Sequence, residues 1–196
     1  MKKQIWTVAL AMVGLFCTQT VHAQAFEKGK TYVSVAYGLV HAGTINKMRA
    51  YKRNEGVQIT KNLRIPIAVQ AEYGLSNRWG VGISSTFEKY VLNYSSDDVF
   101  GGERVKSEDK IGIFSLNARA NYHFGKAQSA FDPYVGAGVG VTHFLYQPAE
   151  WFSIKDNMLL GEFRVGSRYF FTKNIAAQLE IGLGSIFIHA GLTAKF

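Results

Sequence analysis

The chain has 196 residues, of which 47% are hydrophobic, 14% aromatic and 18% charged, and its formal net charge is +8. This length suits one domain or two small ones, and the hydrophobic content excludes a disordered chain. The single cysteine, Cys17, excludes an intramolecular disulfide, and no CxxC motif or Cys/His cluster could hold a structural zinc ion. Outside the first twenty-odd residues, no apolar run reaches the ~18 residues that a transmembrane helix needs. Zinc-finger, disulfide-scaffold and helical membrane proteins are therefore excluded.

The first 23 residues have the three zones of a secretory signal peptide. A basic start is followed by an apolar stretch, Ile5–Phe16, and by a polar tail that ends in Ala23. A membrane anchor fits less well because the apolar stretch is short and no stop-transfer charges follow it. A lipidated Cys17 fits less well because bulky residues precede it. We expect a signal peptide at 1–23, cleaved after Ala23, and an exported domain at 24–196.

In the exported domain, apolar and polar residues alternate with a period of two, which indicates β-strands with one apolar face. The alternation is found in eight segments, namely 31–40, 63–73, 79–91, 111–124, 134–146, 157–171, 175–183 and 186–196. In the last segment it places Ile186, Ile188 and Leu192 on the apolar face and His189 on the polar face. An even number of strands is typical of bacterial outer-membrane barrels.

The sizes of the residues decide which face of such a barrel points inward. The interior of an eight-stranded barrel is just wide enough for side chains to fill. Bulky residues crowd the apolar face, whereas the polar face mixes small residues with charges of both signs. We therefore predict an all-β, eight-stranded antiparallel up-and-down transmembrane β-barrel with its apolar face toward lipid. The charged residues expected to pair inside it are Arg64, Glu72, Glu88, Arg119, Glu162, Arg164, Arg168, Glu180 and Lys195.

Aromatic residues fall at the ends of alternate segments, where the interfacial girdle of an outer-membrane barrel lies. They are Tyr73, Tyr122, Phe124, Tyr169, Phe171 and Phe196. Short connections are expected on this periplasmic side and longer loops on the outer side. The outer connections would be a basic loop at 41–62, a mixed-charge loop at 93–110, an aromatic-tipped loop at 147–156 and a tight turn near Gly184-Ser185. Such loops would carry any interaction chemistry, since packing fixes the barrel itself.

Motifs that could suggest catalysis have simpler explanations. The run Gly136–Gly140 lacks the following helix that a phosphate-binding loop needs, and its glycines lie on the interior face. His143 is the only outward-facing strand histidine, and no nucleophile shares its face. His123 and His189 are expected to form hydrogen bonds in the lumen. We expect no enzyme activity and no catalytic, cofactor-binding or metal site.

Two other functions remain as alternatives. A lipid-modifying enzyme would need a nucleophile, a base and an acid near the lipid-facing surface. A narrow passive channel would need a path past the luminal charges, and open aqueous channels belong to barrels of about sixteen strands. The function expected from the residues is a structural or surface-interaction role in the outer membrane.

The chain resembles the small OmpA-like and OmpX-like barrels of the outer membrane protein β-barrel domain family, which includes porin family proteins. The signal peptide, the eight alternating segments, the glycine-rich run Asp132–Gly140 and the terminal Phe196 carry the resemblance, which covers 24–196. It implies an integral protein of the bacterial outer membrane. In the family, the assembly machinery reads a C-terminal aromatic residue on an alternating strand, and Leu192, Ala194 and Phe196 match that signal.

The expected partners follow from this location. They are outer-membrane lipid and lipopolysaccharide, the outer-membrane assembly machinery and surface ligands of the long loops. We expect no nucleic acid as partner, because an exported protein seldom meets it, and we expect a monomer without cofactors.

Overall fold

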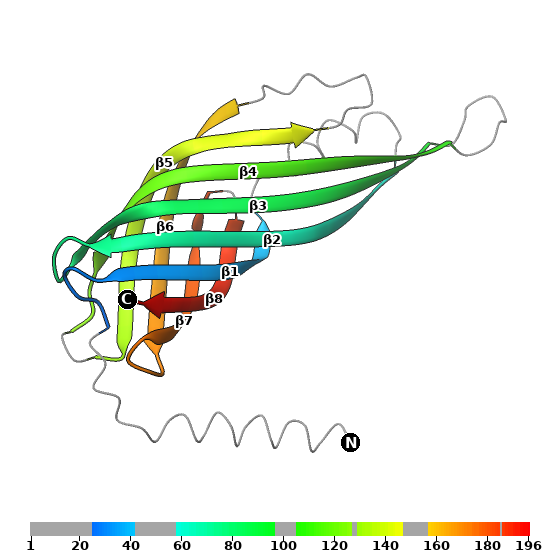
Figure 1. Cartoon of the computed structure of the whole chain (residues 1–196). Helices are drawn as coiled ribbons and strands as arrows, with labels where there is room; N and C mark the ends of the chain where they lie inside the picture. Colours follow the sequence, from blue (N-terminus) through cyan, green and yellow to red (C-terminus); the bar gives the residue numbers. More distant parts are fainter. Residues whose placement is uncertain (1–24, 42–57, 97–104, 127–128, 147–156, 185) are drawn as a thin grey trace, which may run out of the picture.

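The computed structural model describes residues 25–41, 58–96, 105–126, 129–146, 157–184 and 186–196. In it eight antiparallel strands form a closed barrel (Figure 1). They are β1 (Thr31–His41), β2 (Gln58–Gly74), β3 (Trp79–Ser96), β4 (Val105–His123), β5 (Phe131–Tyr146), β6 (Asn157–Phe170), β7 (Ile175–Leu183) and β8 (Ile186–Lys195). Each strand pairs with its neighbours in sequence, and β8 pairs with β1 to close the sheet. The predicted up-and-down barrel is confirmed.

In the described part of the chain, no helix has the length and apolar character needed to cross a bilayer.

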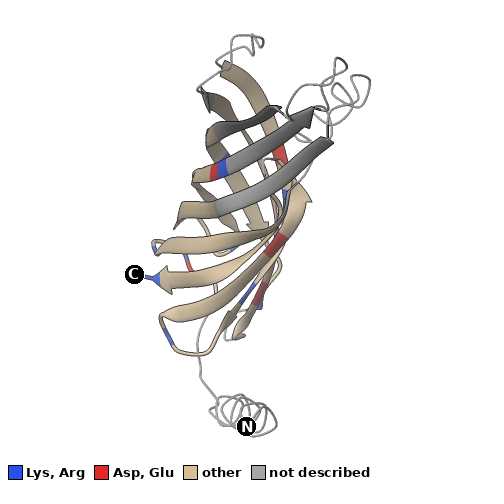
Figure 2. Ribbon diagram, turned by 90° about the vertical axis from the view of Figure 1, so that its right-hand side faces the viewer, with Lys and Arg blue, Asp and Glu red and all other residues tan. Residues whose placement is uncertain are grey.

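The apolar face of the sheet points outward and the polar face inward. In β6, Phe163 and Val165 are 51% and 53% exposed, whereas Arg164 between them is 1% exposed. Where the structure describes the side chains, the same alternation is found in the other strands except at the outer end of β8, and buried polar side chains outnumber buried apolar ones among the described residues. Figure 2 shows few charged residues along the strands. This arrangement suits a barrel whose outer surface is covered by lipid.

Three strands are longer than the alternation predicted. β2, β3 and β4 extend beyond the others toward the outer end (Figure 1), with Gln58 opposite Ser95 and Ser96 opposite Val105. Parts of the loops predicted at 41–62 and 93–110 are therefore strand, which corrects that prediction. Both faces of these extensions are largely polar in sequence, so they lack the amphipathic pattern on which the prediction relied.

Other predictions fall on parts of the chain outside the described residues. They concern the signal peptide with Cys17 and Ala23, the centres of the first two outer loops at 42–57 and 97–104, and the third outer loop at 147–156.

Ile186 was predicted to face lipid, and the structure corrects this. Its side chain is fully buried and clusters with Ala36 and Ala68. The register between β1 and β8 shifts twice between Gly38 and His41, so the outermost residue of β8 has the opposite orientation. A Cβ at Gly38 would lie 2.9 Å from Ile186 Cγ2, so glycine at this position leaves room for the buried isoleucine.

Candidate functional site in the barrel interior

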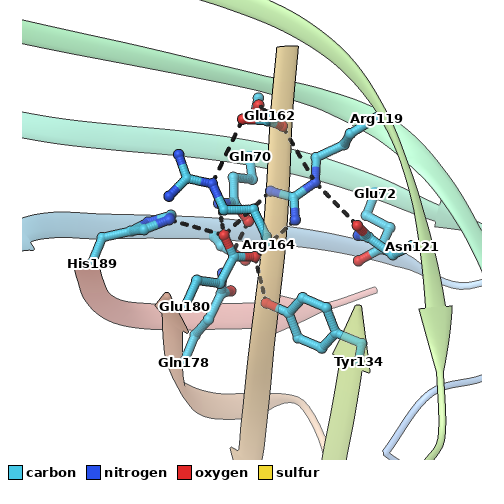
Figure 3. Close-up of polar contacts among 12 residues, drawn as sticks. Gln70, Glu72, Arg119, Asn121, Tyr134, Glu162, Arg164, Gln178, Glu180 and His189 are labelled. Atoms are coloured by element: carbon cyan, nitrogen blue, oxygen red, sulfur yellow. Dashed lines mark hydrogen bonds and ion pairs between the residues drawn. The ribbon is translucent and has the colours of Figure 1, made fainter. Parts of the chain in front are cut away.

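A first group of buried side chains surrounds Glu180 on β7 (Figure 3). Tyr134 Oη donates a hydrogen bond to Glu180 Oε1 at 2.5 Å, and Arg119 Nη2 donates to the same oxygen at 3.0 Å. Gln70 Nε2 donates to Oε2 at 3.1 Å, and His189 Nε2 lies 2.9 Å from that oxygen. The carboxylate is completely buried, so these partners replace its hydration shell.

Glu162 and Arg164 on β6 extend this group toward the outer end. Glu162 Oε1 accepts a hydrogen bond from Ser84 Oγ at 3.1 Å and lies 3.9 Å from Arg119 Nε. Glu162 Oε2 lies 3.8 Å from Arg164 Nε, and Arg164 also donates to the backbone carbonyl of Ile186. Arg119 thus lies between two carboxylates, and Figure 3 shows its guanidinium reaching toward both.

A second group surrounds Glu72 on β2, nearer the end where the chain termini lie. Asn121 Nδ2 and Arg168 Nη2 donate to its two oxygens at 2.7 and 2.5 Å. His123 lies between two carboxylates, with Nε2 2.9 Å from Glu72 Oε1 and Nδ1 2.9 Å from Asp132 Oδ1. Both ring nitrogens can donate only in the doubly protonated form. In that form, the negative charges of Glu72 and Asp132 are balanced by the positive charges of His123 and Arg168.

The N-terminal segment Ala25–Lys30 covers the second group at the end of the barrel that holds the termini. The Phe26 ring stacks on His123 with centroids 3.6 Å apart and an interplanar angle of 3°. Glu27 Oε1 accepts a hydrogen bond from Lys195 Nζ at 2.7 Å, which ties the segment to β8. Gly29, with a φ of +80°, turns the chain and donates from its amide to Gly74. This segment occupies the mouth of the barrel.

A chain of uncharged polar side chains connects β1 to the group around Glu180. Ser34 and Thr193 share a hydrogen bond of 2.8 Å, and Thr193 Oγ1 donates to Gln178 Oε1 at 2.6 Å. Gln178 Nε2 then donates to Gln70 at 2.9 Å, and Gln70 reaches Glu180. A continuous hydrogen-bonded path therefore runs from β1 to β7.

The structure places eight of the nine charged residues predicted for the lumen on the interior face, and all eight are at most 7% exposed. Six of them, Glu72, Arg119, Glu162, Arg164, Arg168 and Glu180, belong to the two groups described above. Lys195 instead pairs with Glu27 of the N-terminal segment. Glu88 is buried nearer the outer end, opposite Ile113 in register. The side chain of Arg64 lies outside the described residues.

Sequence reasoning missed several interior residues. Asp132 is buried beside His123, although it was read only as the start of a glycine-rich run. Tyr32, Tyr134 and Phe170 are buried inside, although aromatic residues were assigned to the lipid-facing side. All three have even residue numbers, like the polar interior residues of the same strands. This shared parity was the signal in the sequence that could have placed them inside the barrel.

In the described part of the chain, no group of three histidine, cysteine, aspartate or glutamate residues is arranged to hold a metal ion. The outward-facing His143 contacts Asn157, with 2.9 Å between Nδ1 and Oδ1. The contacts of the two interior groups fit charge compensation across a narrow lumen.

The outer surface carries the residues predicted for the girdle and for assembly. Tyr73, Phe124, Tyr169 and Phe196 are exposed at the end of the barrel with the short turns. Leu192 is also exposed on the lipid-facing side, and Ala194 is half-buried. Their recognition by an assembly machinery stays a prediction.

Comparisons with known proteins agree with this architecture. A family model described as an outer membrane protein beta-barrel domain matches residues 8–195. The outer membrane protein OprG from Pseudomonas aeruginosa has a similar structure, with a TM-score of 0.60 and 12% identity, covering 90% of this chain and 99% of that chain. At this identity the likeness shows a shared fold.

Two further structures have lower TM-scores. The N-terminal β-barrel domain of Pseudomonas aeruginosa OprF has a TM-score of 0.47 and 17% identity, covering 86% of this chain and 98% of that chain. Ail, the attachment invasion locus protein of Yersinia pestis, solved in complex with the heparin analogue sucrose octasulfate, has a TM-score of 0.49 and 11% identity, covering 86% and 99% of the two chains. A search of curated proteins gives no significant match.

Proposed function

The chain belongs to the outer membrane protein β-barrel domain family and is an integral protein of the bacterial outer membrane, and on that premise we propose that its lumen is plugged. The proposed role is structural or surface-interacting, carried out by a monomer whose long loops contact other molecules. Catalysis and solute passage are not part of this role.

Ion pairs that cross the lumen carry the proposal of a plugged barrel. Arg168 on β6 contacts Glu72 on β2, and Arg119 on β4 contacts Glu180 on β7. Neither pair joins neighbouring strands, so each one spans the interior from wall to wall. The N-terminal segment adds a third obstruction, because Phe26 is buried against His123 at the mouth. A solute or hydrated ion would have to break these contacts to pass.

Conductance in planar lipid bilayers tests this proposal. We expect the parent protein to give no steady current steps. A double variant, Arg119→Gly/Glu180→Gly, removes one lumen-crossing pair and should give small steps. Val165→Gly is the matched control, because its side chain faces outward, and it should stay silent. Steady steps from the parent protein would instead favour the narrow-channel alternative.

For the surface role, we propose lipopolysaccharide as a partner of the first outer loop. Supporting this, the sequence of that loop contains Lys47, Arg49, Lys52 and Arg53, which suit anionic sugars and phosphates. Replacing all four by glutamine should weaken the binding of purified lipopolysaccharide to the detergent-solubilised protein, whereas replacing lysine by arginine and arginine by lysine should preserve it. Equal binding by parent and glutamine variant would remove this partner.

The same samples test the absence of enzyme activity. Lipopolysaccharide and phospholipid incubated with the protein should keep their masses in mass spectrometry. A lipid product that forms with the parent protein would favour the lipid-modifying enzyme instead.

A further inference from the structure

The described exposed charged side chains at the end of the barrel that holds the termini are all basic. They come from every short connection at this end, and we call them the basic rim: Lys28, Lys30, Arg78, Lys126 and Lys173. The acids of this end are occupied elsewhere, since Glu27 pairs with Lys195 and Asp132 is buried beside His123. In Figure 2, blue ribbon marks turns at this end, near the C-terminus.

The basic rim lies directly beside the exposed aromatic residues of the same end. Arg78 Nη1 donates a hydrogen bond to Tyr122 Oη at 3.1 Å, and Tyr122 packs edge-on against Trp79 and Phe124 with 5.0 Å between ring centroids in each pair. Trp79 is exposed on the outer surface. Tyrosine and tryptophan rings in such positions lie at the depth of the lipid headgroups. Arg78 is therefore held at that depth by its girdle partner.

A second basic residue is fixed close to Arg78. The backbone amide of Lys28 donates to Asn77 Oδ1 at 3.2 Å, which attaches the N-terminal segment to the β2–β3 turn. Lys28 and Arg78 thus come from two segments joined at the same point of the rim. Arg78 thus lies beside an exposed indole and a phenol, and the backbone of a second basic residue is bound to its neighbour Asn77. This arrangement suits a lipid whose phosphate meets the bases and whose acyl chain lies along the aromatic rings.

We propose that the basic rim binds the headgroups of anionic phospholipids in the periplasmic leaflet, with Lys28 and Arg78 beside Trp79 as its most ordered site. Short connections and termini are periplasmic in outer-membrane barrels, which places the rim at the phospholipid leaflet. Each lysine or arginine near an anionic membrane surface strengthens the binding to that surface by a factor of about five. Because the rim contains five bases around the barrel, its preference for anionic over zwitterionic lipid should exceed that of a single site.

Trp79 provides a reporter for this site. The substitutions Trp6→Phe and Trp151→Phe leave it as the only tryptophan of the chain. This protein, reconstituted into vesicles, is titrated with brominated phosphatidylglycerol or brominated phosphatidylcholine, and quenching of Trp79 gives the relative affinity of the two lipids. We expect phosphatidylglycerol to be preferred about fivefold or more at low salt, and less in 0.5 M NaCl because exposed charges are screened.

Rim variants decide whether the preference comes from charge. The variant Lys28→Gln/Lys30→Gln/Arg78→Gln/Lys126→Gln/Lys173→Gln should bring the ratio close to one. Its matched control, Lys28→Arg/Lys30→Arg/Arg78→Lys/Lys126→Arg/Lys173→Arg, should keep the preference, as should Lys89→Gln, which removes an exposed lysine near the outer end. Folding of each variant is checked by its heat-modifiable gel migration. If the quintuple glutamine variant does not fold, Lys28→Gln/Arg78→Gln replaces it and should lower the ratio.

Two results would overturn the proposal. One is a ratio near one in the parent protein, and the other is an unchanged preference in the folded glutamine variant. If the parent protein shows no lipid preference but sediments with purified peptidoglycan in a rim-dependent way, the rim binds the cell wall instead.

Discussion

Replacing Glu180 by alanine should destabilise the barrel strongly, because four groups lose a shared acceptor. Tyr134, Arg119 and Gln70 donate to its carboxylate, and His189 lies 2.9 Å from it. Removing one partner of a buried ion pair typically costs about 3–5 kcal/mol, because the other charge is left uncompensated. Arg119 keeps a hydrogen bond to Asn121 and lies 3.9 Å from Glu162, so we expect the lower part of that range, about 3 kcal/mol.

A double-mutant cycle separates the ion pair from the loss of side-chain volume. Arg119→Met/Glu180→Leu replaces both charges by apolar groups of similar size, and it should be much less destabilised than either single variant. Equilibrium unfolding by urea in phospholipid vesicles, followed by the gel shift between folded and unfolded forms, measures each free energy of unfolding. A change below about 0.5 kcal/mol for Glu180→Ala, or purely additive effects in the cycle, would refute the reasoning.

Three further predictions test the packing, the lipid-facing surface and the assembly signal. Gly166→Ala should lower stability by about 1–3 kcal/mol, because its Cβ would lie 2.5 Å from the Tyr134 ring, whereas Gly161→Ala on the same strand meets nothing within 4 Å and should be near neutral in urea unfolding. Val165→Arg should cost about 2–4 kcal/mol in vesicles, because its side chain faces lipid, while Val165→Leu, which keeps an apolar side chain at the same place, should cost little; equal effects would contradict this orientation. Phe196→Ala should reduce the amount of folded protein in outer-membrane fractions, as measured by immunoblot, more than Leu183→Ala does, although both side chains are exposed.

The sequence predicted the parts of the fold that depend on amphipathic alternation. Strands such as β6 and β7 have one bulky apolar face and one charged face, so both their existence and their orientation could be deduced. The extensions of β2, β3 and β4 could not be, because a strand that is polar on both faces has no such pattern. Ile186 was misplaced since a register shift reverses orientation without any mark in the alternation.

The sequence could predict which charged residues face the interior, but it could not predict which of them pair with one another. Interior parity identified Glu72, Arg119 and Glu180, but which base meets which acid depends on strand stagger and barrel closure, which a single sequence does not define. The contact of Phe26 with His123 could not be predicted for another reason. It precedes the first strand, so no periodicity connects it to His123, on which it stacks.

Gel migration of outer-membrane fractions from cells that express the chain reports both the location of the protein and the closure of its barrel. An outer-membrane barrel with a paired polar interior should appear in that fraction as a compact band when unboiled and shift to its full apparent mass after boiling. A soluble periplasmic protein with no such shift would contradict the account, because the apolar face would then line a core and the charged face would meet water.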